Sequence, residues 1–123
     1  MKGLESNVIA EKSRAFAIRV IKLYKYLVEK KRETVLSRQL LRCGTSIGAN
    51  VREAIQAQSR KDFVAKLCIA LKECSETGYW LDLLHETSFL TRRQFDSVDT
   101  DCQELMKILT SIIKTTKANP RQT

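Results

Sequence analysis

The chain has 123 residues, of which 43% are hydrophobic and 29% charged. This length suits one domain across residues 1–123, and the hydrophobic share excludes a disordered tail. Only 4 glycines and 1 proline occur. These are too few turn residues for a sheet protein, so the sequence predicts an all-α fold.

Charge and hydropathy indicate which kinds of partner the protein binds. Residues 1–10 lack the apolar core of a signal peptide, and no run approaches the roughly 18 apolar residues of a membrane span. We therefore expect a cytoplasmic protein without a membrane partner. The net charge is +8, from 22 Lys and Arg against 14 Asp and Glu. Such an excess favours RNA or DNA as partner, while solubility alone is the alternative explanation.

Apolar positions at helical spacing predict four amphipathic helices. The first covers about residues 7–31, with Asn7 or neighbouring Ser6 as its N-cap. The second covers about residues 34–58. Their apolar stripes are Phe16, Val20, Leu23 and Leu27, then Leu36, Leu40, Gly44, Ile47, Val51 and Ile55.

The third helix follows Ser59, which can cap it with Asp62 as the acidic residue of a capping box, and it ends near His85. The fourth runs from Thr91 to about Lys117, and residues 118–123 should form a frayed tail. The two stripes are Phe63, Leu67, Ala70, Cys74, Thr77, Leu81 and Leu84, then Phe95, Val98, Cys102, Leu105, Leu109 and Ile112. Because the connections are short, sequential helices should be antiparallel neighbours in an up-down-up-down four-helix bundle.

Both ends of such a bundle would be basic. The first and third connections would lie at one end, and the second connection at the other. The candidate nucleic-acid-binding residues are Lys30, Lys31, Arg32, Arg38, Arg92 and Arg93 at the first end, and Arg60 and Lys61 at the second. Contacts of these cations with phosphates would give salt-dependent, sequence-indifferent binding.

Residues that carry enzyme chemistry are sparse. His85 is the only histidine, and a histidine in the last turn of a helix commonly interacts with free carbonyls. Glu73 and Glu76 are three apart, but no Glu-x-x-His motif accompanies them as in di-metal bundles. We expect no enzyme activity, no cofactor and no metal. The cysteines lack metal-ligand spacing and are interpreted as small buried hydrophobes: Cys43, Cys68, Cys74 and Cys102.

Residues 43–54 place two glycines, Gly44 and Gly48, inside the second predicted helix. Each costs about 1 kcal/mol relative to alanine there, which indicates that another helix or another subunit approaches the backbone. Asn50 and Glu53 share a face and could bridge to a partner. Trp80 is interpreted as an interface residue in preference to a base-stacking one. The candidate packing residues are Gly44, Ser46, Gly48, Asn50, Glu53 and Trp80.

This segment also resembles the Ser-Ile-x-x-Asn-Ile-x-Glu box of the 23S rRNA-intervening sequence protein family, whose members are also called four-helix bundle proteins. The matching residues are Leu41-Arg42, residues 45–51 and Glu53-Ala54. Residues 19–23 resemble the family's first helix. Its third helix is matched by Asp62-Phe63, Leu67, Ile69-Ala70, Glu73, Glu76 and residues 79–81. The resemblance covers about residues 13–113, with minor departures at Cys43, usually basic or apolar, and Ala54, usually glycine.

The resemblance implies a bacterial, cytoplasmic four-helix bundle that assembles into a homopentameric ring. Family members are often encoded within insertions in large-subunit ribosomal RNA genes. Related bundles are accessory subunits of diversity-generating retroelements, where a basic barrel contacts nucleic acid and a reverse transcriptase. The resulting hypothesis is a non-enzymatic, self-assembling bundle whose basic surface binds RNA or DNA. The alternative is a protein–protein interaction adaptor whose charge is incidental.

Overall fold

The computed structural model describes residues 4–119, with side chains from residue 6 onward. It contains four α-helices: α1 (Leu4–Glu29), α2 (Leu36–Ile55), α3 (Arg60–Glu86) and α4 (Arg92–Lys117). No strand occurs in this part of the chain, which confirms the predicted all-α four-helix bundle. Ala118 and Asn119 follow the last helix, and the remainder of the predicted tail, residues 120–123, lies outside the described residues.

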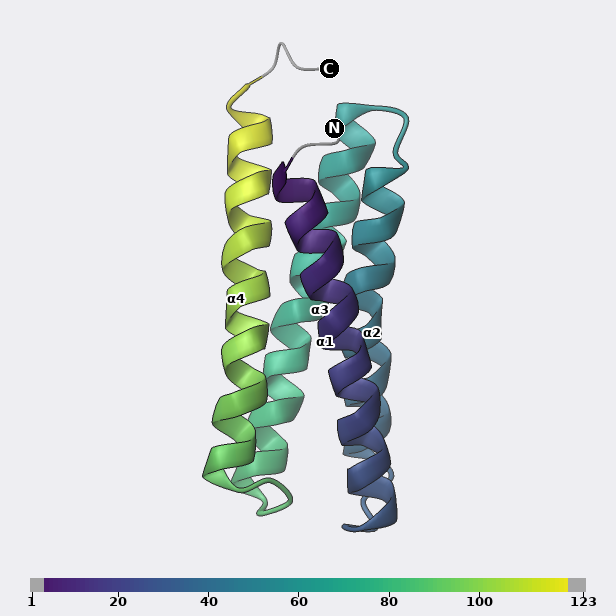
Figure 1. The fold of residues 1–123 in the computed structure, drawn as a ribbon, viewed down its shortest axis with the longest axis vertical. Coiled ribbons are helices and arrows are strands. Elements are labelled where there is room, and N and C mark those ends of the chain that lie inside the picture. The colour runs from purple at the N-terminus through teal and green to yellow at the C-terminus, as the bar shows by residue number, and fades with distance from the viewer. Residues whose placement is uncertain (1–3, 120–123) are drawn as a thin grey trace.

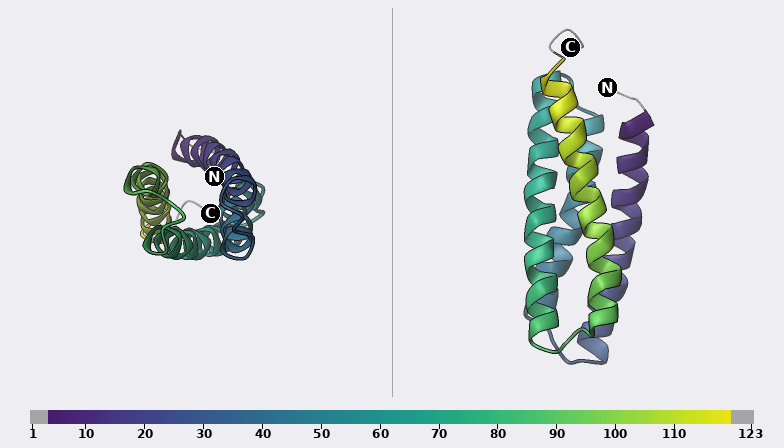
Figure 2. Two further views of the ribbon diagram at one scale, coloured as in Figure 1. Left: turned by 90° about the horizontal axis from the view of Figure 1, so that it is seen from below. Right: turned by 90° about the vertical axis from the view of Figure 1, so that its left-hand side faces the viewer.

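Each helix runs antiparallel to the one before it (Figure 1). The α1–α2 and α3–α4 connections lie at one end of the rod, and the α2–α3 connection lies at the other end. Ion pairs between α2 and α3 agree with the antiparallel arrangement. Arg42 on α2 pairs with Glu73 on α3, whereas Glu53, later in α2, pairs with Lys66, earlier in α3. Seen from one end, the helices form an arc in which α1 and α4 are the most loosely packed neighbours (Figure 2).

Polar side chains bridge this loose seam between α1 and α4. Lys12 Nζ lies 3.3 Å from Glu104 Oε1, and Arg19 Nη1 lies 2.6 Å from Asp101 Oδ2. The same guanidinium donates to the carbonyl of Ser97 at 3.0 Å. Because these ion pairs are exposed, each contributes at most about 1 kcal/mol.

The boundaries of α1 differ from the prediction. The helix begins at Leu4, before the predicted N-caps Asn7 and Ser6, so that prediction was wrong. No glycine or proline lies between Leu4 and the apolar stripe, and nothing therefore stops the helix from extending toward the N-terminus. The helix ends at Glu29, and Arg32 then turns the chain through the left-handed region, with φ 59°.

A capping carboxylate that sequence reasoning missed sets the start of α2. The side chain of Glu33 accepts the backbone N–H groups of Val35, Leu36 and Ser37 at 3.2, 2.9 and 2.7 Å. The Ser37 hydroxyl in turn donates to the Glu33 carbonyl at 2.8 Å. Burial raises the pKa of the Glu33 carboxyl, but the hydrogen bonds outweigh it and the pKa lies below its ordinary value. The helix therefore begins at Leu36, after the predicted residue 34.

Serine and threonine caps begin the last two helices, of which the Ser59 cap was predicted and the Thr91 cap was not. The Ser59 side chain accepts the Asp62 N–H at 3.0 Å, but the Asp62 carboxylate does not complete a capping box in the described structure. Thr91 forms such a box with Gln94, whose side chain accepts the Thr91 N–H at 2.9 Å. The α2 helix ends at Ile55, with Gln56 as its C-cap, and not at the predicted residue 58.

The core contains buried apolar residues from all four helices, among them Val20, Ile47, Leu81 and Leu105. Most positions of the predicted stripes are buried, while Leu23 remains half-buried at the edge of the core. Periodicity predicts these positions well because one apolar face of each helix turns toward the bundle axis. No helix within residues 4–119 combines the length and apolar character needed to cross a membrane.

Candidate nucleic-acid interface

Most of the chain's net charge lies on the α1–α2 hairpin, defined here as residues 4–59. These residues include 11 Lys and Arg against 5 Asp and Glu, whereas residues 60–117 include 9 of each. The α3–α4 hairpin is therefore electrically balanced. This asymmetry can be counted in the sequence, but the expectation of two basic ends overlooked it.

Ion pairs within the described residues leave most cations of the α1–α2 hairpin without a carboxylate partner. Lys12, Arg19 and Arg42 are paired with acids on α3 or α4. The unpaired cations are all exposed: Arg14, Lys22, Lys25, Lys30, Lys31, Arg32, Arg38 and Arg52. Their positive charge is therefore available to an external anion.

A groove of ≈ 800 Å³ runs between α1 and α2 on this hairpin. Two of the unpaired cations line it, Arg14 from α1 and Arg52 from α2, and no carboxylate does so. The remaining lining residues are small, polar or apolar: Asn7, Ala10, Ala17, Thr45, Gly48, Ala49, Val51, Ile55 and Gln56. We call this the α1–α2 groove. Sequence reasoning missed both arginines, because only the packing of α1 on α2 brings them to one groove.

The glycines of the small-residue segment allow the two walls of the groove to approach closely. A Cβ built on Gly44 would lie 2.8 Å from Val20 Cγ1, and one built on Gly48 would lie 3.3 Å from the Ser13 carbonyl oxygen. Both neighbours belong to α1 of the same chain. The helix that approaches these glycines is therefore α1, and the expectation of a subunit at this point is not needed to explain them.

The other candidate packing residues also find partners within the chain. The Ser46 hydroxyl donates to the Arg42 carbonyl at 2.7 Å, and Asn50 Nδ2 donates to the Ser46 carbonyl at 2.9 Å. Glu53 lies 3.1 Å from Lys66 Nζ on α3. Trp80 Nε1 donates to Glu76 Oε2 at 3.1 Å, and Arg42 binds the same carboxylate. Of these contacts, the Glu53–Lys66 and Arg42–Glu76 pairs join α2 to α3, and the others lie within one helix.

Among the candidate basic residues at the first end of the bundle, Lys30, Lys31, Arg32 and Arg38 are exposed beside the α1–α2 connection. The α3–α4 connection lies at the same end (Figure 1), as expected. Arg93 is exposed there, but Arg92 pairs with Asp96 at 3.4 Å.

At the other end of the bundle, Arg60 is engaged within the chain while Lys61 is exposed. Arg60 Nη1 donates to the carbonyls of Thr116 and Asn119 at 3.5 and 2.8 Å, and so it satisfies the C-terminal end of α4. These bonds occupy part of the Arg60 guanidinium, which sequence reasoning did not anticipate. Lys61 is exposed to solvent.

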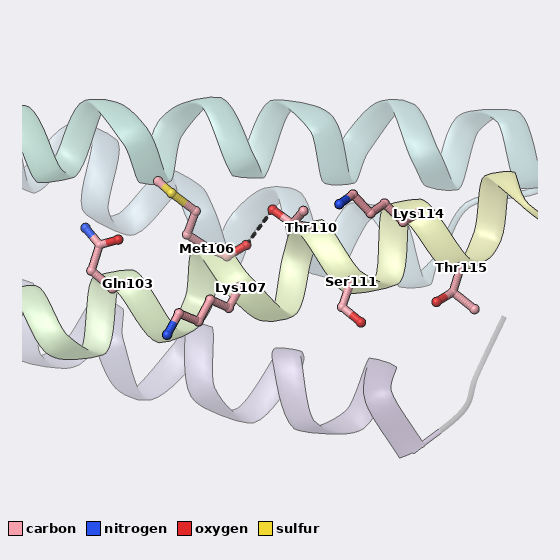
Figure 3. Close-up of a pocket in the computed structure, with 7 residues that line it drawn as sticks. All are labelled: Gln103, Met106, Lys107, Thr110, Ser111, Lys114 and Thr115. Atoms are coloured by element: carbon pink, nitrogen blue, oxygen red, sulfur yellow. Dashed lines mark hydrogen bonds between the residues drawn. The ribbon is translucent and has the colours of Figure 1, made fainter.

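A second hollow lies on α4 alone and has a volume of ≈ 520 Å³. The residues that line it are Gln103, Met106, Lys107, Thr110, Ser111, Lys114 and Thr115. Figure 3 shows Lys107 and Lys114 at successive positions along α4, and the Thr110 hydroxyl donates to the Met106 carbonyl at 2.8 Å. This hollow is lined by α4 alone, whereas residues of two helices line the α1–α2 groove.

The residues considered for enzyme chemistry make structural contacts. His85 stacks on Phe95, with ring centroids 4.9 Å apart and an interplanar angle of 21°. Glu73 and Glu76 both bind Arg42. No group of three or more metal-ligating side chains occurs among the described residues.

Comparisons with known proteins place the chain in a family. The model of the 23S rRNA-intervening sequence protein family matches residues 5–111. A search of the curated proteins finds no match. Among solved structures, the chain is similar to a protein of unknown function from the S23 ribosomal protein family of Bacteroides thetaiotaomicron. The two share 56% sequence identity and a TM-score of 0.89, over 90% of this chain and 99% of that chain. This chain therefore belongs to the 23S rRNA-intervening sequence protein family.

Proposed function

We propose that this protein is a non-enzymatic, cytoplasmic bundle that binds RNA or DNA through its α1–α2 hairpin. One observation carries the proposal: the α1–α2 groove is lined by Arg14 and Arg52 and by no carboxylate, on the hairpin that holds most of the net charge. Arginine guanidinium groups recognise phosphate through several parallel N–H donors. The other exposed cations of the hairpin would contact neighbouring phosphates along the same strand.

The chemistry of the groove favours the sugar–phosphate backbone over the bases. Recognition of unstacked bases uses exposed aromatic side chains as stacking platforms, and none of the residues lining the groove is aromatic. The most exposed aromatic residue among those described, Tyr79, lies on α3. We therefore expect binding with little sequence preference and strong salt dependence.

A titration of labelled duplex DNA and of an RNA hairpin at several salt concentrations tests the proposal. The wild-type protein should bind tightly at low salt, and log K should fall linearly with log salt concentration. The double variant Arg14→Gln/Arg52→Gln should reduce the magnitude of that slope by about 1.8 on duplex DNA, because two phosphate contacts are lost.

A matched control is the variant Lys107→Gln/Lys114→Gln on α4, which removes the same charge from a different face. Exposed charges separated by more than about 8–10 Å are largely screened from one another at physiological salt. At that salt concentration, the control variant should therefore bind nucleic acid nearly as tightly as the wild type does. Equal losses in both double variants would reject the groove as the site. Absence of binding at low salt would reject the nucleic-acid function itself.

We also propose that copies of the chain assemble, with the homopentamer implied by the family resemblance as the expected state. The support is a pair of exposed apolar side chains on α3, Ile69 and Tyr79, which are 43% and 57% exposed. Native mass spectrometry of the wild type and of Ile69→Glu/Tyr79→Glu tests this. A monomeric wild type that captures a stoichiometric protein partner after nuclease treatment would favour the adaptor function instead.

A further inference from the structure

Two buried cysteines meet across the interface between α3 and α4. The sulfur atoms of Cys74 and Cys102 lie 3.7 Å apart, although the residues are 28 positions apart in the chain, and both side chains are 0% exposed. Cys74 Sγ lies 3.2 Å from the Cys102 carbonyl oxygen, and Cys102 Sγ lies 3.4 Å from the Cys74 carbonyl oxygen. Each sulfur therefore contacts the carbonyl oxygen of the other residue. No other pair of cysteines among the described residues has this arrangement.

We propose that Cys74 and Cys102 form a dithiol–disulfide couple whose oxidation covalently joins α3 to α4. Their sulfurs are already in van der Waals contact at 3.7 Å, and oxidation would bring them to the bond length of about 2.05 Å. This inference is independent of nucleic-acid binding, because both cysteines belong to the core and neither lines the α1–α2 groove.

The oxidant class is a peroxide. Hydrogen peroxide first transfers one oxygen atom to the Cys74 thiol, which becomes a sulfenic acid, and one water molecule is released. The Cys102 sulfur then attacks the Cys74 sulfur. The S–S bond forms, the S–O bond breaks, and a second water molecule leaves. In total the two thiols lose two electrons and two protons, and the peroxide is reduced to two molecules of water.

The surroundings of the pair favour Cys74 as the first sulfur to react. The hydrogen bond between the thiols lowers the pKa of Cys74 and, together with burial, raises that of Cys102. The thiolate is the reactive form of cysteine. Because both sulfurs are inaccessible in the closed bundle, oxidation also requires α3 and α4 to separate briefly, and its rate reports that opening.

The other two cysteines are poorly placed to form a disulfide with Cys74 or Cys102. Cys43 receives a hydrogen bond from the Thr77 hydroxyl at 3.3 Å, and its own thiol points to the Leu40 carbonyl at 3.7 Å. Cys68 is exposed on α3, so the interpretation of all four cysteines as buried was wrong at this position, and its thiol can meet only another molecule. We therefore expect one specific pairing within the chain.

The test uses the full chain carrying Cys68→Ser, which removes the exposed thiol. The folded, reduced protein is treated with hydrogen peroxide, alkylated and digested with trypsin without reduction. Each remaining cysteine falls in a separate tryptic peptide, because the chain is cleaved after Arg42, Lys72 and Arg93. We expect the intact mass to fall by about 2 Da through loss of two hydrogens, and peptides 73–92 and 94–107 to be linked until dithiothreitol is added.

Other outcomes overturn the proposal. Linkage of Cys43 to either partner, formation of sulfinic and sulfonic acids alone, or two thiols that stay reduced while Cys68 of the wild type is fully oxidised would each do so. The variant Cys102→Ser must abolish the linked peptide pair, and Cys43→Ser must retain it. Should Cys102→Ser fail to fold, the peptide map of the Cys68→Ser protein decides by itself.

Discussion

Replacing Gly44 with alanine should destabilise the protein, whereas the same replacement at Gly78 should stabilise it. Both glycines lie inside helices, where alanine is favoured by about 1 kcal/mol. Their surroundings differ. A Cβ at Gly44 would lie 2.8 and 2.9 Å from the two methyl carbons of Val20, whereas a Cβ at Gly78 would meet no heavy atom within 4 Å. Packing therefore decides the sign of the effect.

The structure also sets the magnitude. Val20 is 0% exposed, and a β-branched side chain in a helix has one strongly preferred rotamer, so it cannot turn away from the added methyl group. Overpacking of this kind costs about 1–3 kcal/mol. After the gain in helix propensity, Gly44→Ala should lower the free energy of unfolding by up to about 2 kcal/mol, whereas Gly78→Ala should raise it by about 1 kcal/mol.

Urea unfolding followed by far-UV circular dichroism measures both changes, at one protein concentration so that assembly contributes equally. The m-values should stay constant if only stability changes. Gly48→Ala should fall between the other two variants, because its Cβ would lie 3.3 Å from a backbone carbonyl of α1. If Gly44→Ala proved as stable as Gly78→Ala, the close approach of α1 to α2 beside Val20 would be refuted.

Three further predictions concern caps and ion pairs. Glu33→Gln should lower the free energy of unfolding by about 1 kcal/mol near neutral pH. Hydrogen bonds lower the folded-state pKa of the Glu33 carboxyl despite its burial. Urea melts should therefore show the full loss of stability above about pH 4.3, and the loss should vanish as pH falls through the folded-state pKa. A double-mutant cycle of Arg42→Ala and Glu76→Gln should give a coupling energy of about 0.5–1 kcal/mol, since the Arg42 side chain is 51% exposed, and zero coupling would show that the pair does not hold α2 to α3. Arg60→Ala should speed amide hydrogen exchange in the last turn of α4, whose carbonyls it binds, and unchanged exchange would contradict that role.

Much of the fold could be read from local pattern. The apolar stripes predicted four helices, and Ser59 was correctly predicted to cap the third, while the fourth begins at Arg92, one residue after the predicted Thr91. A cap of this kind depends on a side chain and a backbone N–H three residues away, so it is encoded locally. Glu33 escaped prediction because it precedes α2 by three residues and caps three N–H groups at once, which the usual Ser/Thr patterns do not cover.

The candidate site was less accessible to such reasoning. The order of the connections predicted which basic residues lie at each end of the bundle. The sequence does not reveal, however, that Arg60 binds the end of α4 or that Arg92 pairs with Asp96. Arg14 and Arg52 were not singled out, since they are 38 positions apart and meet one groove only through the pairing of α1 with α2. The excess of positive charge in residues 4–59 is visible in the sequence and indicates this hairpin.

The sequence by itself determined the helical class, the core-facing positions and the uneven distribution of charge, because each depends on composition or on spacing within one helix. Tertiary structure alone decided which surfaces meet. It placed α1 against Gly44 and Gly48, and it brought Cys74 to Cys102. The physical reason is register: the rotation and axial offset of each helix pair follow from side-chain packing across the interface, which no single helix specifies.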